Sequence, residues 1–575
     1  PQEVREYLSQ QSHLMLPYHD AENNQRWIKL PTERLLSVID TLVELFDTDP
    51  LNPDGNLVIS RHEGLHYNDL LNDPSLHWKG AKELQALSEK IRAFNGVKHI
   101  NPPEGLQAEL RDYQQKGFDW LQFLGEYQFG GILADDMGLG KTLQALAHLL
   151  AEKQQGRMKH PNLVIAPTSL MGNWRREANK FAPQLNVLTL HGAERQNFFD
   201  HIQTYDLVLT TYQLILRDQD FYKAQQFHAL ILDEAQAIKN AKAKSTQVIF
   251  QLQAKQRLCL TGTPMENHLG EIWSMYHFLM PGYLGTQERF TRLFRTPIEK
   301  HADAVRQQQL RKRVEPFMLR RTKEVVAKEL PPKTEIIRTV ELANDQQDLY
   351  ETVRLAMDKK VRDEISKKGL ARSQIMILDA LLKLRQVCCD PTLVKLDKAR
   401  KVKGSAKFDL LMNLLPDMIA EGRKILLFSQ FVSMLTLIEK HLKKKNISYS
   451  KLTGQTRKRQ EAIDAFQEGD ATVFLISLKA GGTGLNLTAA DTVIHYDPWW
   501  NPAVEEQATD RAYRLGQDKP VFVYKLITEN TVEERIISLQ ERKRHLAQGL
   551  YSDKAQKKSL SFDQDELMDL LRPID

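Results

Sequence analysis

The sequence predicts an α/β protein with two doubly wound parallel sheets, helical insertions and an extra N-terminal domain. Short continuous runs of Val, Ile and Leu alternate with helical patterns in two separate stretches of the chain. Such runs indicate strands that are covered on both faces, as in parallel sheets, whereas half-exposed strands would alternate apolar and polar residues. A length of 575 residues also favours several domains, because single cores rarely grow beyond ~300 residues.

The first sheet is expected within residues 105–284. Its first strand, 132–134, precedes a helix that includes residues 143–150. Five further apolar runs predict the other strands: LVIAP (163–167), NVLTL (186–190), LVLTTY (207–212), ALILD (229–233) and RLCLTGTP (257–264).

The second sheet is expected within residues 404–545. The region between the sheets, 285–403, reads as almost wholly helical with a break at PPK (331–333), and is expected to form protrusions and the inter-lobe linker. The strands of the second sheet are predicted at KILLFSQF (424–431), ATVFLISL (471–478), DTVIHYD (491–497) and VFVYKLI (521–527).

Both ends of the chain are expected to form separate pieces. Residues 1–104 would be an accessory domain, with a capped helix that begins near Thr32 and a strand after the turn-rich passage DPLNPDGNLVIS. Residues 546–575 would be a C-terminal helical tail. Because Pro1 cannot start translation, we expect a fragment, a processed chain or a chain whose leading residues are absent.

Composition narrows the class and location of the protein. The net charge is +5, from 79 basic and 74 acidic residues, which is too small to indicate a nucleic-acid partner. No apolar run approaches the ~20 residues of a membrane span, and the first residues carry no apolar signal core, so we expect a soluble chain with no membrane partner. Three cysteines offer no disulfide framework and no zinc-binding pair, which favours a cytoplasmic location.

The stretch GGILADDMGLGKTLQAL (130–146) reads as a strand, a glycine-containing turn and the start of a helix. In the pattern G-x-x-x-x-G-K-[ST], backbone N–H groups wrap phosphates, the lysine reaches the β- and γ-phosphates, and the hydroxyl holds Mg²⁺. Asp135 stands where the first glycine should be. The alternative is a tight turn with a solvated lysine. The residues expected to bind nucleotide are Asp136, Gly138, Gly140, Lys141 and Thr142.

Further polar residues are expected at the same sheet edge, where parallel α/β folds bind ligands. ALILDEAQAIKN ends a strand with Asp233, expected to hold Mg²⁺ with Thr142, and Glu234, expected to orient or deprotonate the attacking water. The alternative is a plain helix cap. Gln114 precedes the phosphate loop, and its amide could pair with the adenine edge or be an exposed helical glutamine.

The second sheet carries the run SLKAGGTGLNLTAADTVIHYDPWWNPAVEEQATDRAYRLGQ. Its glycines, among them Gly484, permit a backbone to approach phosphates closely. Arg511 and Arg514 lie three residues apart on an expected helix, so both could neutralise charge on a transferring phosphoryl group. Trp499 and Trp500 would be core or edge aromatics.

Taken in order, these motifs resemble those of the SWI/SNF family of superfamily 2 DNA-dependent ATPases. The resemblance covers about residues 105–545, and the family's phosphate loop, D-x-M-G-x-G-K-T, dispenses with the first glycine. Tyr513 and Asp390 stand where many eukaryotic relatives have histidine. A tyrosine at position 513 resembles the pattern of bacterial members of the family, which often carry a zinc-binding segment further upstream. The motifs are DDMGLGKT, LDEAQAIKN, LTGTPMEN, ILLFSQF, SLKAGGTGLNLTAADTVIHYDPWWNP and QATDRAYRLGQ.

The resemblance implies two RecA-like lobes with ATP and Mg²⁺ between them and double-stranded DNA across both. Lys141, Glu234, Arg511 and Arg514 would be catalytic. The implied activity is that of a monomeric, nucleoid-associated translocase that displaces DNA-bound protein without strand separation. A strand-separating helicase, an enzyme acting on RNA, and a nucleotide-gated binding module are the alternatives. By similarity, the DNA contacts would be Thr168, Ser169, Asn173, Trp174, Thr211, Ser429, Gln430, Lys479 and Thr483.

Overall fold

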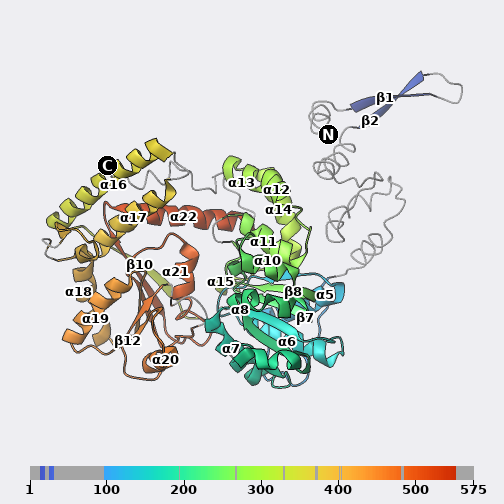
Figure 1. The fold of residues 1–575 in the computed structure, drawn as a ribbon, viewed down its shortest axis with the longest axis horizontal. Helices are drawn as coiled ribbons and strands as arrows, with labels where there is room; N and C mark the ends of the chain where they lie inside the picture. The colour runs from blue at the N-terminus through green and yellow to red at the C-terminus, as the bar shows by residue number, and fades with distance from the viewer. Residues whose placement is uncertain are drawn as a thin grey trace.

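The computed structural model describes residues 13–19, 25–31 and 96–551, apart from residues 193, 266–267, 328–329, 369–372, 400–401, 403, 479 and 481–484. Figure 1 shows two α/β lobes side by side, and a hairpin of β1 (His13–His19) and β2 (Gln25–Pro31) that lies away from both. The helix expected from Thr32, the strand expected after it and the tail beyond residue 551 lie outside the described residues. Within the described part of the chain, no helix is both long enough and apolar enough to cross a membrane.

Lobe 1 is built on a sheet of seven strands: β3 (Gly131–Leu133), β4 (Asn162–Ala166), β5 (Val187–Thr189), β6 (Leu207–Thr211), β7 (Gln226–Asp233), β8 (Gln253–Leu260) and β9 (Met318–Leu319). Their order is β5-β6-β4-β7-β8-β3-β9, and every neighbouring pair is parallel. The apolar strands are buried because helices cover the sheet. These helices are α5 (Asp112–Tyr127), α6 (Lys141–Gln154), α7 (Thr168–Phe181), α8 (Tyr212–Arg217), α9 (Gln219–Lys223), α10 (Lys244–Gln251) and α11 (Gly270–Leu279).

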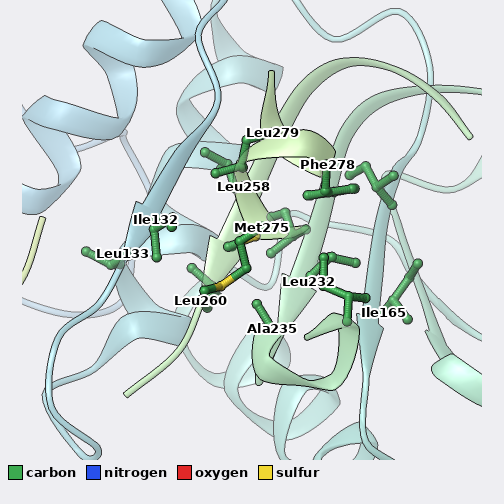
Figure 2. Close-up of a cluster of buried hydrophobic side chains, with 14 of the residues drawn as sticks. Ile132, Leu133, Ile165, Leu232, Ala235, Leu258, Leu260, Met275, Phe278 and Leu279 are labelled. Atoms are coloured by element: carbon green, nitrogen blue, oxygen red, sulfur yellow. The ribbon is translucent and has the colours of Figure 1, made fainter. Parts of the chain in front are cut away.

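The core of lobe 1 includes the face on which α11 packs. Figure 2 shows Met275, Phe278 and Leu279 of this helix beside strand residues that include Leu232 and Leu258. All five side chains are buried. Because burying a side chain of this size stabilises a fold by about 1.5–3 kcal/mol, the packing holds the strand ends, and the loops that follow them, in place.

Lobe 2 is built on a sheet of six strands: β10 (Lys333–Val340), β11 (Ile425–Ser429), β12 (Tyr449–Leu452), β13 (Val473–Ser477), β14 (Thr492–His495) and β15 (Val521–Thr528). Their order is β10-β15-β14-β11-β13-β12, again wholly parallel. The two sheets confirm the predicted fold class. The helices of this lobe are α18 (Ala406–Ala420), α19 (Val432–Lys444), α20 (Arg459–Gln467), α21 (Pro502–Thr509) and α22 (Val532–Tyr551).

The region between the sheets is not almost wholly helical, so that expectation is wrong. β9 lies beside β3 in lobe 1, and β10 pairs with β15 of lobe 2 along its whole length. The sequence of β10, KTEIIRTV, is rich in β-branched residues, which favour a strand. This one segment therefore adds a strand to each sheet. The helices of the region are α12 (Gln287–Phe290), α13 (Thr296–His301), α14 (Ala304–Val314), α15 (Lys323–Val326), α16 (Asn344–Lys368) and α17 (Gln374–Cys389).

Candidate active site

A cleft of about 710 Å³ lies between the lobes. Lobe 1 contributes the phosphate loop (residues 134–140), the start of α6 and the end of β7. Lobe 2 contributes α21 and residues 510–514, which we name the arginine turn. The predicted residues that line the cleft are Asp136, Gly138, Gly140, Lys141, Thr142, Asn173, Asp233, Glu234 and Arg514.

Two glycines allow the phosphate loop its shape. Gly138 and Gly140 have positive φ angles of 85° and 78°, which other residues adopt at a cost. A Cβ on Gly138 would lie 2.8 Å from Cβ of Arg514, and one on Gly140 would lie 2.5 Å from Nε2 of Gln114. The loop continues into Lys141, whose Nζ donates to two carbonyl oxygens of the loop at 2.5 and 3.2 Å.

Asp135, the departure from the common loop pattern, is fully buried beneath the loop. Arg321 pairs with it: Nε donates to Oδ1 at 2.8 Å, and a second guanidinium nitrogen contacts Oδ2. Gln144 Nε2 also donates to Oδ2, at 3.2 Å. The aspartate thus ties the loop to the residues that follow β9. Sequence reasoning missed this role of Arg321, which lies 186 residues from Asp135 along the chain.

The two carboxylates at the end of β7 face the phosphate loop across the cleft. Trp174 Nε1 donates to Asp233 Oδ2 at 2.7 Å, and Gln236 Nε2 donates to Glu234 Oε2 at 2.8 Å. From lobe 2, Gln507 Nε2 reaches Glu234 Oε1 at 3.3 Å. Burial raises the pKa of both carboxyl groups, and the Asp233 charge raises that of Glu234 further. A raised pKa brings a carboxylate closer to the range useful for a general base.

The arginine turn does not continue α21, so the expected helix at this point is wrong. α21 ends at Thr509, and the next residues form turns. The side chain of Gln517 donates to the carbonyl of Ala512 in these turns at 3.0 Å, and to the carbonyls of Thr488 and Ala490, before β14, at 3.1 and 2.7 Å. Arg514 lines the cleft, whereas Arg511 is 1% exposed. Burial lowers the pKa of Arg511 to about 10, against the opposing charge of Glu234.

Gln114 lies behind the phosphate loop. Its Nε2 donates to the carbonyl of Leu139 at 3.2 Å, and its Oε1 accepts from the backbone N–H of Arg111 at 3.0 Å. A second hollow, lined in part by Arg111, Tyr113 and Lys116, lies nearby. The side chain therefore braces the loop, and its contact with adenine stays a prediction.

Three of the residues expected to contact DNA, Trp174, Thr211 and Ser429, have buried side chains in this structure, and their contact with DNA stays a prediction. The Trp174 indole donates to Asp233. Thr211 Oγ1 accepts from the N–H of residue 214 at 3.4 Å, and Ser429 Oγ donates to Asp497 at 2.6 Å. Thr211 and Ser429 are the last residues of β6 and β11, whereas Trp174 lies within α7, and the sequence did not indicate their burial.

The other expected contacts differ in exposure. Thr168 is exposed at the start of α7. Asn173, half-buried, donates from Nδ2 to Glu177 Oε1 at 2.7 Å, and Gln430 donates from Nε2 to Asp497 Oδ2 at 2.5 Å. The Ser169 side chain and residues Lys479, Thr483 and Gly484 lie outside what the structure describes.

Glu177 is a cleft residue that sequence reasoning missed. Its carboxylate accepts from Asn173 and lies within hydrogen-bond reach of the Thr142 hydroxyl. Burial raises its pKa, and the Arg514 charge opposes this. The sequence could have indicated the contact between Asn173 and Glu177, because residues four apart share one face of a helix.

Comparisons with known proteins find matches along both lobes. Residues 113–393 match the SNF2-related domain model, and residues 406–516 match the model of the helicase conserved C-terminal domain. The chain is 38% identical over 538 residues to YwqA of Bacillus subtilis, named as an ATP-dependent helicase/translocase, covering 91% of this chain and 58% of that protein. It is 34% identical over 484 residues to the ISWI chromatin-remodeling complex ATPase ISW2 of Saccharomyces cerevisiae, covering 81% and 43%.

A solved structure also matches. The Sulfolobus solfataricus SWI2/SNF2 ATPase core in complex with dsDNA is 38% identical, with 78% of this chain and 94% of that chain covered and a TM-score of 0.42. The chain spans about half the length of the curated relatives described above.

Proposed function

The chain belongs to the SNF2 family of ATP-dependent helicases and translocases, and on this premise we propose that it is a DNA-dependent ATPase that translocates on double-stranded DNA. We further propose that it remodels or displaces DNA-bound protein without separating the strands. The observation that carries the proposal is the cleft, in which Lys141, Asp233 and Glu234 of lobe 1 lie opposite Arg514 of lobe 2.

The groups that line the cleft fit ATP and Mg²⁺. The loop N–H groups, the N-terminus of α6 and Lys141 suit a phosphate chain. The Thr142 hydroxyl and the Asp233 carboxylate are oxygen ligands, which Mg²⁺ prefers, and bound Mg²⁺ would neutralise phosphate charge. Trp174 orients the Asp233 carboxylate by its hydrogen bond.

Glu234 is the proposed base. Its carboxylate would accept a proton from the attacking water, and Gln236 and Gln507 hold it in place. Because Gln507 belongs to lobe 2, this arrangement is complete only when the lobes lie together. Arg514, and Arg511 after a local rearrangement, would stabilise charge on the transferring group.

Alternate closing and opening of the lobes would move the protein along DNA. Each closure would complete the cleft, and each hydrolysis would release it. Contacts would be made mainly to phosphates, so little sequence preference is expected. We propose a monomeric motor that acts on nucleoid DNA in the cytoplasm, in keeping with the similarity to the Bacillus subtilis relative.

The test is ATP hydrolysis by the purified chain with no nucleic acid, single-stranded DNA, double-stranded DNA or RNA, with Glu234→Gln as control. Strong stimulation by duplex DNA alone, lost in Glu234→Gln, would support the proposal, and displacement of a DNA triplex would then test translocation. Equal or greater stimulation by single strands or RNA would favour a strand-separating or RNA-directed helicase, which the relatives' names also permit. No stimulation by any of them would favour a nucleotide-gated binding module.

A further inference from the structure

Lys323 lies where the two lobes meet. It begins α15, the short helix after β9, which Figure 1 shows at the junction of the lobes. The residue is only 4% exposed although lysine is almost always solvated. Its backbone N–H donates to Asp136 Oδ2 of the phosphate loop at 2.9 Å. The main chain of Lys323 is therefore fixed to lobe 1.

The side chain of Lys323 is fixed to lobe 2. Its Nζ lies 2.7 Å from Asp510 Oδ1 and also donates to the backbone carbonyl of Tyr513. Asp510 and Tyr513 are the residues that immediately precede Arg511 and Arg514. The Lys323 ammonium group therefore binds the arginine turn at the two residues that directly precede its arginines.

The ring of Tyr513 strengthens this junction. Lys323 Nζ lies 5.2 Å from the ring centroid, and Lys333 Nζ, at the start of β10, lies 5.7 Å from it. A cation near an aromatic face is attracted by the ring, more strongly where water is excluded. Both lysines belong to the segment that adds β9 to one sheet and β10 to the other.

We propose that Lys323 is a positioning residue that holds the arginine turn against the phosphate loop and thereby places Arg514 in the cleft. The proposal rests on the proposed ATP hydrolysis for its kinetic consequence, but the contact itself is independent of it. Because a misplacement of about 1 Å in a catalytic group can lower a rate about 100-fold, loss of Lys323 should lower kcat while nucleotide binding by lobe 1 persists.

The experiment compares Lys323→Met, which removes the charge and keeps most of the length, with Lys323→Arg. Lys153→Met is the matched control, since Lys153 Nζ also lies 2.7 Å from a carboxylate, that of Asp206, but within lobe 1 and away from the cleft. Each variant is assayed for kcat and KM for ATP with duplex DNA, and for binding of a fluorescent, non-hydrolysable ATP analogue. We expect kcat of Lys323→Met to fall by about 100-fold with analogue binding within about threefold of wild type.

Removing one partner of a buried ion pair leaves the other charge uncompensated, so Lys323→Met could lose activity through destabilisation alone. The double variant Lys323→Met/Asp510→Asn removes both charges. We expect it to melt closer to wild type than the single variant does, and still to show the low kcat. A double variant with wild-type kcat, or a parallel loss of analogue binding and kcat in Lys323→Met, would overturn the proposal.

A distance measurement separates this proposal from the proposed function. Spin labels on cysteines introduced at Lys159 of lobe 1 and Lys445 of lobe 2 report the distance between the lobes, because both sites are exposed and the native cysteines are buried. Lys323→Met should broaden the distance distribution, and Lys153→Met should not. If the wild-type protein hydrolyses no ATP, the proposed function is wrong. The contact of Lys323 with the arginine turn would be rejected separately, if Lys323→Met has the same distribution of distances between the lobes as wild type.

Discussion

At the scale of the residue, Asp135 shows how a departure from a common motif is accommodated. A buried carboxylate is costly unless it is paired and hydrogen-bonded. Arg321 and Gln144 supply both kinds of partner, and the resulting contacts join the phosphate loop to the segment after β9. Asp135, which departs from the general phosphate-loop pattern, therefore anchors the loop. Its partner Arg321 lies far from it in the sequence.

Arg321→Ala should strongly destabilise lobe 1. The change leaves Asp135 buried without its cation, so we expect a loss of roughly 3–5 kcal/mol in the free energy of unfolding, measured by urea denaturation. Arg362→Ala is the control, because Arg362 also pairs with a carboxylate at 2.9 Å but is 66% exposed. Its cost should be below about 1 kcal/mol. Equal costs for the two variants would contradict this account of Asp135.

Trp174→Phe should weaken the proposed Mg²⁺ site while preserving the core. Phenylalanine fills most of the space but cannot donate to Asp233, so the carboxylate loses its orientation. We expect the Mg²⁺ concentration for half-maximal ATP hydrolysis to rise about tenfold. Trp273→Phe is a matched control, since the buried Trp273 indole donates to a backbone carbonyl at 3.0 Å in α11 packing and not to a cleft residue. An equal shift in both variants would mean that the effect is one of folding.

At the scale of the element, strands with a continuous apolar run were predictable, whereas the strands β9 and β10 between the two sheets were not. The strands β4, β6 and β7 each contain a continuous apolar run, LVIA, LVL and ALIL, because both faces of these strands are covered. β10 has β-branched residues, but it lies at the sheet edge and also carries charged residues, so it lacks the continuous apolar run of a central strand. The turn that follows α21 likewise depends on Gln517, whose side chain joins Ala512 of that turn to residues 488 and 490 before β14.

His495, the last residue of β14, should make lobe 2 sensitive to acid. Burial lowers its pKa to about 3, and its Nε2 lies 3.0 Å from Thr509 Oγ1. Because the pKa of unfolded histidine is about 6.5, the unfolded chain takes up the proton first as the pH falls between these values, and stability is lost. The loss should approach about 1.4 kcal/mol per pH unit, a slope that His495→Gln should reduce when unfolding is measured at pH 7 and pH 5. Replacement of the exposed His301 by Gln should leave the slope unchanged.

At the scale of the whole molecule, the candidate active site belongs to neither lobe alone. Gln507 and Arg514 approach it from lobe 2, and the phosphate loop and β7 form the opposite wall. The segment from β9 to β10 spans the same junction and is part of both sheets. A change in the angle between the lobes must therefore alter the cleft, which is the coupling that the proposed translocation requires.

Binding of duplex DNA should depend steeply on salt. If contacts to phosphates dominate, the apparent affinity of duplex DNA, measured from stimulation of ATP hydrolysis, should fall more than about tenfold between about 50 and 200 mM salt. The maximal rate at saturating DNA should change little, and two duplexes of unrelated sequence should behave alike. A weak salt dependence, or a strong preference for one sequence, would argue against a phosphate-tracking motor.

The sequence by itself determined the two parallel sheets, the phosphate loop and the carboxylates at the end of β7, because each depends on a local pattern of buried strand, glycine turn and strand-end acid. Tertiary structure alone decided the partner of Asp135, the burial of Trp174 and Ser429, and the role of Lys323 between the lobes. The physical reason is that burial and ion pairing depend on which distant segments meet. No local sequence pattern shows which distant segments come into contact.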